Sequence, residues 1–181
     1  VPLERCIDEG KTPIAVVFHL NQENPEEKGY AVYLKDISRV AFADSLGVKQ
    51  NTSADIAAFD GNENTHAIYS TANMGSPLAE SVFSIWEYGQ SAYVPSVAQM
   101  TLLYHAKAVI NPYLESIGGV PISDEPDRCW YWTSTEVKGQ EAAKLFRTRL
   151  KKLKIKTYVH YEIKGYPSNV ALIDSDEGYG K

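Results

Sequence analysis

The segments YVPSVAQM, at Tyr93–Met100, and WYWTSTE, at Trp130–Glu136, decide how this chain is predicted to fold. The first indicates a strand end that runs into a helix capped by Ser96, because Gln99 follows three residues later in the pattern of a capping box. The second indicates an aromatic strand that ends in a polar corner. Neither segment holds a nucleophile–base pair, a set of metal ligands or a phosphate-binding loop. We therefore expect both segments to build the scaffold.

Strand patterns precede these segments. The apolar, β-branched run Thr12–Leu20 predicts a buried strand, and Tyr30–Lys35 predicts the strand that returns from a polar hairpin loop. The segment Arg39–Ala43 predicts a further short strand.

Helix signals occupy the middle of the chain. We expect a short helix that is capped by Asn64 or Thr65 and reaches Ser70. Ser76 followed by proline indicates a second helix start, with serine as the cap and proline at the first helical position. A helix after Ser96 is predicted to stop and restart at Asn111-Pro112, and Gly118-Gly119 is predicted to end it.

Strand patterns return in the last third. The alternation of apolar and polar residues over 153–163 indicates a half-buried strand, and Asn169–Asp174 indicates a last buried strand. The segment Glu141–Leu150 favours a helix by its alanine, leucine and lysine content. Segregated strands and helices predict an α+β fold. The first and last strands are the most apolar, so we expect them to be neighbours in one sheet.

Length and composition are typical of one globular domain. The chain has 181 residues, of which 44% are hydrophobic and 23% charged. We expect a single domain over 1–181, with its core at about 12–174 and a polar tail at 175–181. The net charge of −5 argues against nucleic acid as a partner, and no apolar run is long enough to span a membrane.

The chain begins at Val1, so we expect that a signal or lipid anchor has been removed. Cys6 and Cys129 fit either a disulfide, if the protein is secreted, or two buried thiols.

The order of several phrases resembles the C-type-lectin-like domains of Bacteroidetes surface and fimbrial proteins, the major paralogous domain group of the Fibrobacter type. The phrases are Phe59–Ile68, the Ser-Pro-led helix from Ser76, Tyr93–Ser96, Asn111–Gly119 and Tyr131–Glu136. Together they cover most of the chain.

The resemblance implies a C-type-lectin-like fold of antiparallel sheets, two or three helices and long loops, with paired N- and C-terminal strands. It also implies that Glu141–Leu150 is a strand. Two departures stand out: Tyr93 replaces the family's tryptophan, and the final strand lacks the usual arginine.

The function that the resemblance implies is non-enzymatic adhesion at the cell surface or after secretion, as in a fimbrial tip. Its partners would be a carbohydrate or a protein on a host or neighbouring cell, and other fimbrial subunits. One alternative is a structural or assembly module of a larger surface protein. Another is a relative of formylglycine-generating enzymes, which need cysteine or metal chemistry near a cleft. We expect no enzymatic activity and no cofactor, because the catalytic motifs of hydrolases, metalloproteases and nucleotide-binding enzymes do not occur.

Two charged segments are candidates for ligand binding. Three carboxylates within four residues, from Asp124 to Asp127, suit either calcium or a solvated acidic loop. Lysines at every second position from 152 to 156 would share one strand face, which suits either an anionic glycan or solvent. No metal ligand and no catalytic residue is predicted. The predicted ligand-binding residues are Asp124, Glu125, Asp127, Arg128, Lys152, Lys154, Lys156 and Tyr158.

Overall fold

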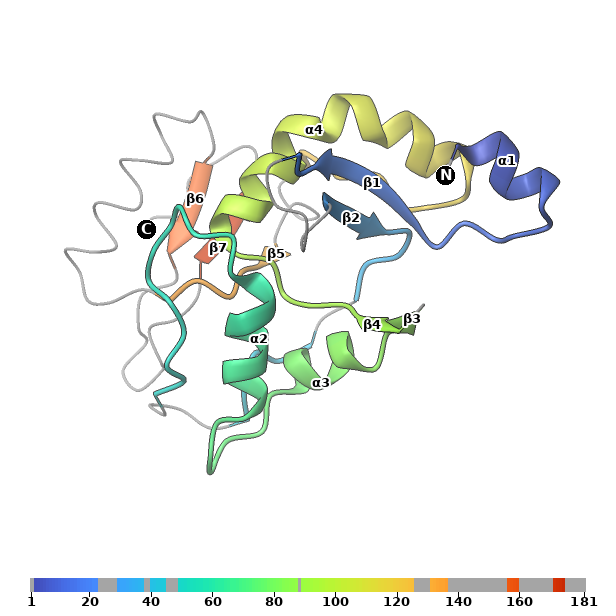
Figure 1. Ribbon diagram of the computed structural model, residues 1–181. Helices are drawn as coiled ribbons and strands as arrows, with labels where there is room; N and C mark the ends of the chain where they lie inside the picture. The colour runs from blue at the N-terminus through green and yellow to red at the C-terminus, as the bar shows by residue number, and fades with distance from the viewer. Residues whose placement is uncertain are drawn as a thin grey trace. The chain divides into compact units, whose positions relative to one another are not determined.

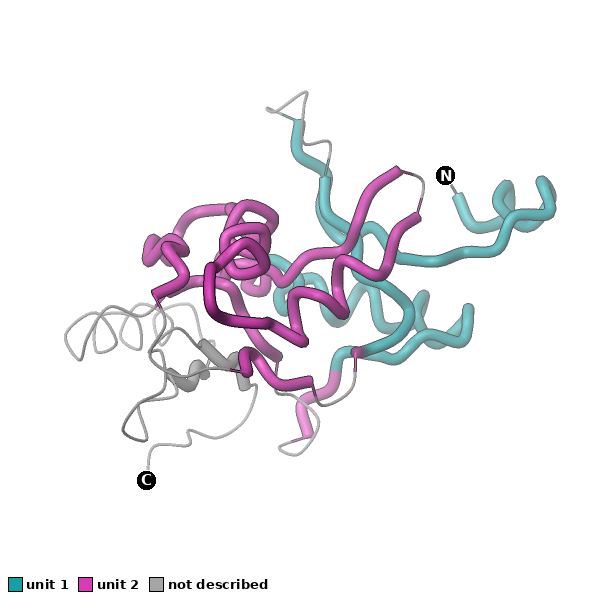
Figure 2. Tube along the Cα trace, turned by 90° about the horizontal axis from the view of Figure 1, so that it is seen from below, with its two compact units in different colours: residues 1–36, 102–122 teal, residues 37–101, 123–181 magenta. Residues whose placement is uncertain are grey.

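The computed structural model describes residues 2–22, 29–37, 40–44, 49–87, 89–125, 131–136, 156–159 and 171–174. The chain divides into two compact units (Figure 2). Unit 1 comprises residues 1–36 and 102–122, and unit 2 comprises residues 37–101 and 123–181. Each unit is described by itself, and the predicted single-domain organisation stays a prediction.

Unit 1 begins with helix α1 (Leu3–Asp8) and an antiparallel hairpin, shown in blue in Figure 1. The hairpin pairs β1 (Ala15–Leu20) with β2 (Gly29–Tyr33), as the apolar runs of the sequence predict. A β-bulge shifts the register between Val17 and His19. The bulge inserts one extra residue, Phe18, into β1, and this insertion changes which side chains face the core.

A long helix, α4 (Val97–Ser116), contributes its residues from 102 onward to unit 1. Its Leu103, Ile110 and Leu114 recur at helical spacing and are buried. The predicted break at Asn111-Pro112 is wrong, because α4 continues through Pro112. The Asn111 side chain clamps Ile122: its Nδ2 donates to the Ile122 carbonyl, and its Oδ1 accepts from the Ile122 amide. These two bonds to a residue outside the helix stabilise α4 next to Pro112, where the low helix propensity of proline predicts a break.

The end of α4 follows the prediction from Gly118-Gly119. Gly118 adopts a φ of 74°, a left-handed conformation that favours glycine. The Gly119 amide then donates to the Leu114 carbonyl at 2.7 Å, which satisfies a carbonyl that the helix leaves without an internal partner.

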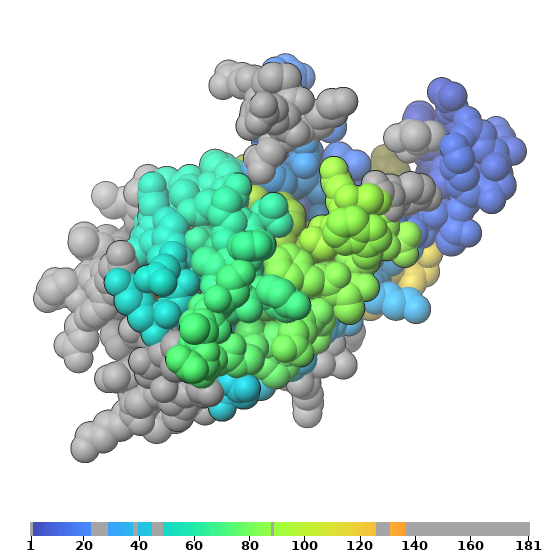
Figure 3. All heavy atoms as spheres, turned by 60° about the horizontal axis from the view of Figure 1, so that its bottom comes forward, coloured from blue at the N-terminus to red at the C-terminus, as the bar shows by residue number. Residues whose placement is uncertain are grey.

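Unit 2 contains two short helices that pack on each other, α2 (Gly61–Tyr69) and α3 (Pro77–Phe83). Figure 3 shows them side by side in shades of green. The predicted cap of α3 is confirmed, because Ser76 Oγ accepts from the Ala79 amide at 3.1 Å. Helix α2 begins earlier than predicted. Asn64 does not cap it, because its Oδ1 instead accepts from the Ser53 amide.

The strands of unit 2 are short and antiparallel. β3 (Trp86–Glu87) pairs with β4 (Gln90–Ser91) in a tight hairpin. β5 (Tyr131–Trp132), β6 (Lys156–Val159) and β7 (Ala171–Asp174) form a sheet in the order β5-β7-β6. The strands predicted around residues 130, 156 and 171 are confirmed as elements. The segment Glu141–Leu150 and the tail 175–181 lie outside the described residues.

Two of the strand predictions are wrong. Residues 40–44 form no strand, because Ala41 and Phe42 give their carbonyls to Leu78 and Ser76 at the start of α3. The first and last strands are not paired: β1 pairs with β2, and β7 lies between β5 and β6. An apolar strand pattern predicts that a strand is buried, but it does not predict which strands lie beside it. It therefore could not show that β7 pairs with β5 and β6. The C-type-lectin-like fold class stays a prediction.

Candidate functional site

The two segments that decide the fold meet in unit 2, where they form a cluster of buried polar side chains. We call this cluster the polar junction. Its side chains lie at the start of α4 and immediately after β5. Its members are Ser96, Gln99, Thr133, Ser134, Thr135 and Glu136, all of them buried.

Gln99 is the hub of the polar junction and is only 2% exposed. Its Oε1 accepts from the Ser96 amide at 2.9 Å and from the Gly61 amide at 3.2 Å. Its Nε2 donates to the Tyr93 hydroxyl at 3.2 Å. The backbone N–H of Gln99 in turn donates to Ser96 Oγ at 3.3 Å, which confirms the predicted capping box. One side chain thus links the start of α4 to the start of α2.

The polar corner after β5 attaches to the same helix start. The Ser134 amide donates to the Pro95 carbonyl at 2.9 Å, and the Val97 amide donates to Thr135 Oγ1 at 3.0 Å. The Glu136 amide donates to the Ser53 carbonyl at 2.6 Å. These bonds use main-chain groups that a helix start and an irregular segment would otherwise leave without partners.

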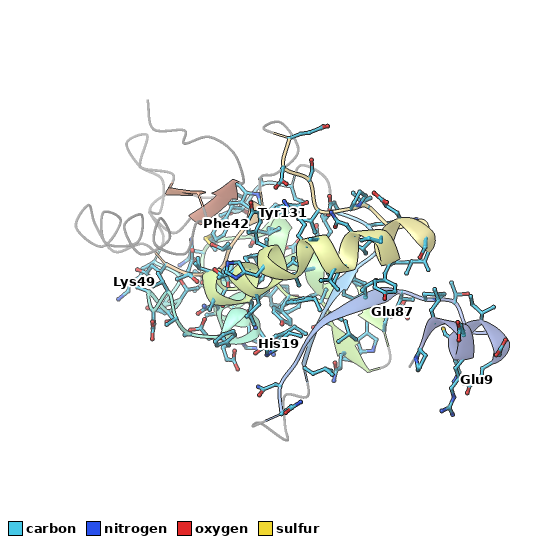
Figure 4. The ribbon with its side chains drawn as sticks, turned by 90° about the horizontal axis from the view of Figure 1, so that it is seen from above. Glu9, His19, Phe42, Lys49, Glu87 and Tyr131 are labelled. Carbon is cyan, nitrogen blue, oxygen red and sulfur yellow. The ribbon has the colours of Figure 1, made fainter. Side chains whose placement is uncertain are left out.

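An apolar contact supports the corner. The rings of Trp132 and Phe42 lie 5.4 Å apart at a tilt of 52°, a geometry that aromatic pairs favour. Figure 4 labels Phe42 and Tyr131, the residue that precedes Trp132.

Ser134 and Glu136 are the members of the polar junction whose side chains bear on catalysis. Ser134 Oγ is buried and has no hydrogen-bond partner within the part of the chain that the structure describes. Glu136 Oε2 accepts from Thr52 Oγ1 at 3.5 Å, a long contact. An activated serine requires a base within hydrogen-bond reach. The junction therefore supports the predicted scaffold role of both segments.

A second candidate is the outer edge and exposed face of β1 in unit 1, which we call the β1 edge. Two of its apolar side chains are mainly in solvent: Val17 is 57% exposed and Leu20 is 68% exposed. Ala31, which lies opposite Val17 on β2, is exposed as well. Among the described strands, β1 has a backbone partner on one edge only, which is β2.

The β-bulge explains this exposure. Phe18 and His19, although consecutive, both contact the ring of buried Tyr30, at centroid distances of 6.2 Å and 5.7 Å. Figure 4 labels His19 on this strand. Because the consecutive side chains of Phe18 and His19 both point to the inner face, their neighbours Val17 and Leu20 point to the outer face. Sequence reasoning treated the whole run as buried and so missed this surface; the absence of charge from Thr12 to Leu20 was the signal available.

The described structure contains four of the eight predicted ligand-binding residues, so the predicted site stays a prediction. Asp124 and Glu125 are exposed, and the Glu125 amide donates to Ser123 Oγ at 3.0 Å. Lys156 and Tyr158 lie on β6, in register with Asp174 and Leu172 of β7. The remaining four residues, Asp127, Arg128, Lys152 and Lys154, lie outside the described residues.

In the described ranges, no group of three or more histidine, cysteine, aspartate or glutamate side chains is placed to hold a metal ion. Calcium binding stays a prediction. Cys6 is a free thiol whose Sγ donates to the Lys11 carbonyl at 3.4 Å, and Cys129 lies outside the described residues. None of the helices described combines the length and apolar character needed to cross a membrane.

Comparison with known proteins gives matches to part of the chain. Residues 132–181 match the family model "Domain of unknown function DUF1846, N-terminal". A UPF0371 protein from Streptococcus sanguinis (strain SK36) is 53% identical over 47 residues, which is 26% of this chain and 10% of the relative. A UPF0371 protein from Clostridioides difficile (strain 630) is 52% identical over 46 residues, 25% of this chain and 9% of the relative.

A third relative, from Fusobacterium nucleatum, is also a UPF0371 protein and is 51% identical over 47 residues, which is 26% of this chain and 9% of the relative. The chain thus matches only about a tenth of the length of these relatives. No solved structure matches the chain.

These findings overturn the resemblance to Bacteroidetes lectin-like domains. The matches carry no lectin or fimbrial signal, and the proteins come from Streptococcus, Clostridioides and Fusobacterium. The family model also begins at Trp132, inside the phrase Tyr131–Glu136 on which the resemblance relied. The adhesion function and the fimbrial role were derived from that resemblance and were wrong. From residue 132 to its last residue, this chain is similar to the N-terminal DUF1846 domain.

Proposed function

We propose that this chain acts through protein–protein contact and not through catalysis, with the β1 edge as its contact surface. One observation carries the proposal. β1 is an uncharged strand that, within the described residues, is hydrogen-bonded on one edge only. A strand of this kind presents a row of N–H and C=O groups to which an extended polypeptide can add as a further strand.

The side chains of the β1 edge favour a polypeptide over a charged small molecule. From Thr12 to Leu20 there is no lysine, arginine, aspartate or glutamate, and His19 lies against the ring of Tyr30. Val17 and Leu20 instead offer apolar surface to solvent. In strand addition the main-chain hydrogen bonds supply affinity, and exposed side chains of this kind select the apolar residues of the incoming strand.

The polar junction supports the non-catalytic part of the proposal. Its best-connected side chain, Gln99, accepts from two backbone amides, and Thr135 Oγ1 accepts from a third. Side chains committed to main-chain groups in this way hold the backbone in place. They are therefore not available to activate a nucleophile or to bind a reacting group.

Hydrogen exchange of the full chain tests the proposal. The probes are extended ten-residue peptides, each selected from a displayed library and added to the protein. We expect peptides with alternating apolar residues to slow the exchange of the β1 amides and to leave those of β4 unchanged. Val17→Lys should weaken this binding at least tenfold. The matched control is Ala31→Lys, which changes the neighbouring strand on the same face and should bind nearly as the parent does.

Two results would contradict the proposal. One is a library in which no peptide protects β1. The other is protection that appears at the polar junction, for example around Ser134, and not at β1; that result would restore a ligand site to unit 2.

A further inference from the structure

We propose that unit 2 has a contact surface of its own, which binds a basic polypeptide segment. The surface is the outer side of α2, α3 and β3, and we call it the aromatic–acidic face. Its residues all lie in unit 2, so it does not rest on the β1 edge. Exposed aromatic rings mark the surface, and its charge identifies the partner. The residues are Tyr69, Glu80, Phe83, Trp86 and Glu87.

Aromatic side chains lie open to solvent on this face. Trp86 is 64% exposed on β3, and Tyr69 is 53% exposed at the end of α2. The Tyr69 ring meets the half-buried Phe83 ring of α3 edge-on, with centroids 5.2 Å apart. Three residues of chain, from Phe83 to Trp86, span at most about 11 Å. Figures 1 and 3 show α3 and the β3–β4 hairpin side by side, so the three rings share one region of the surface.

The charge of this part of the chain has one sign. Residues 50–106 contain five aspartates and glutamates and no lysine or arginine. In the rest of the chain acidic and basic residues balance at 18 each, so this segment accounts for the whole net charge of −5. Glu80 and Glu87 are exposed, and the ion pairs among the described residues all involve Glu9 of unit 1. No described cation therefore neutralises the two carboxylates of the face.

A segment with arginine or lysine between apolar residues matches both features. Glu80 lies one helical turn before Phe83, and Glu87 directly follows Trp86, so each ring has a carboxylate near it. Arginine stacks on aromatic rings and also pairs with carboxylates. An acidic partner would be repelled by this face. The rings are spread over α2, α3 and β3, a wider surface than one small cation covers, which favours a polypeptide.

Fluorescence anisotropy of labelled peptides added to the full chain tests the inference. The probes are peptides of arginine and apolar residues, selected on the protein from a displayed library. Trp86→Ala should raise the dissociation constant at least about tenfold, because tryptophan is often a dominant residue in binding. The matched control is Tyr113→Ala: Tyr113 is 56% exposed on α4 in unit 1, and this variant should bind as the parent does. An unchanged circular dichroism spectrum checks the folding of both variants.

A pair of charge reversals separates a specific contact from general attraction. Glu80→Lys and Glu115→Lys change the net charge equally, but Glu115 is exposed on α4 and lies outside the face. Glu80→Lys should raise the dissociation constant at least about tenfold, whereas Glu115→Lys should leave it nearly unchanged. Parent binding should weaken as salt increases from about 0.1 M to about 1 M, because salt screens exposed charges.

Three results would overturn the inference. One is a library from which no peptide binds the parent protein. Another is an equal loss from Glu80→Lys and Glu115→Lys, which would reduce the effect to net charge. The third is binding that Val17→Ser abolishes and Trp86→Ala leaves intact, which would place the basic peptides on the β1 edge.

Discussion

The polar junction of unit 2 and the β1–β2 hairpin of unit 1 place their side chains in opposite environments. The junction buries six polar residues and commits Gln99 and Thr135 to backbone amides. The hairpin does the reverse, because it leaves the apolar side chains of Val17 and Leu20 in water. Most buried polar groups are hydrogen-bonded, and contiguous exposed apolar patches often mark sites of interaction. This contrast is the reason that the proposed contact surface lies on the hairpin.

The largest expected effect tests whether unit 1 depends on apolar packing. Leu114→Ala removes a side chain that is fully buried in α4 and should lower the free energy of unfolding by about 2–5 kcal/mol, because a cavity remains. Urea denaturation measures the loss. Val109→Ala, on the exposed face of the same helix, should change stability by no more than about 0.5 kcal/mol. Equal losses from both variants would show that unit 1 does not rely on this core.

The next effect tests the hub of unit 2. Gln99→Leu keeps the volume but leaves the amides of Ser96 and Gly61 without their acceptor. An unsatisfied buried donor costs about 1–3 kcal/mol, so the loss of two acceptor bonds should lower the free energy of unfolding by at least about 2 kcal/mol. The control is Gln90→Leu, at an exposed position on β4. A neutral Gln99→Leu would mean that the apolar contacts of unit 2 suffice without the polar junction.

A smaller effect compares two adjacent buried hydroxyls. Thr135→Val removes the acceptor of the Val97 amide and should cost about 1–2 kcal/mol. Ser134→Ala removes a hydroxyl without a partner in the described structure, so it should be neutral within about 0.5 kcal/mol or slightly stabilising. Thermal melts of the two variants in parallel measure the contrast. A large loss for Ser134→Ala would reveal a bound group at that hydroxyl.

The smallest effect lies at the surface of unit 1. Lys11, and to a lesser extent Arg5, hold the pKa of Glu9 below its ordinary value of 4.5. A depressed carboxyl pKa stabilises the folded state above pH 4.5, and this stabilisation is lost as the pH falls through the folded-state pKa. Glu9→Gln should therefore lower the melting temperature slightly at neutral pH and not at low pH. In the Lys11→Gln background the difference should shrink, and a difference that instead grows at low pH would contradict this assignment.

Local signals in the sequence predicted much of the scaffold correctly. The capping box of Ser96 and Gln99, the cap of Ser76 and the stop at Gly118-Gly119 all depend on residues within one helical turn. The hairpin β1–β2 was likewise visible as two apolar runs around a polar loop. Such features are encoded locally, because the interacting groups are close in the chain.

Features that depend on distant partners were not predicted. The continuation of α4 through Pro112 depends on the two hydrogen bonds between the Asn111 side chain and the Ile122 backbone, and no local sequence pattern predicts these bonds. The similarity to the N-terminal DUF1846 domain also shows that short phrases in a plausible order are weak evidence of ancestry. Each phrase reflects a cap or a corner that unrelated chains can share.

From the sequence alone, the caps at Ser76 and Ser96, the stop at Gly118-Gly119 and the apolar runs of the β1–β2 hairpin could be predicted. Only the tertiary structure decided which strands pair. β7 lies between β5 and β6, not beside β1, and the bulge at Phe18 turns Val17 and Leu20 outward. The physical reason is that caps and turns are settled by neighbours a few residues apart, whereas strand pairing is a competition among segments far apart in the chain.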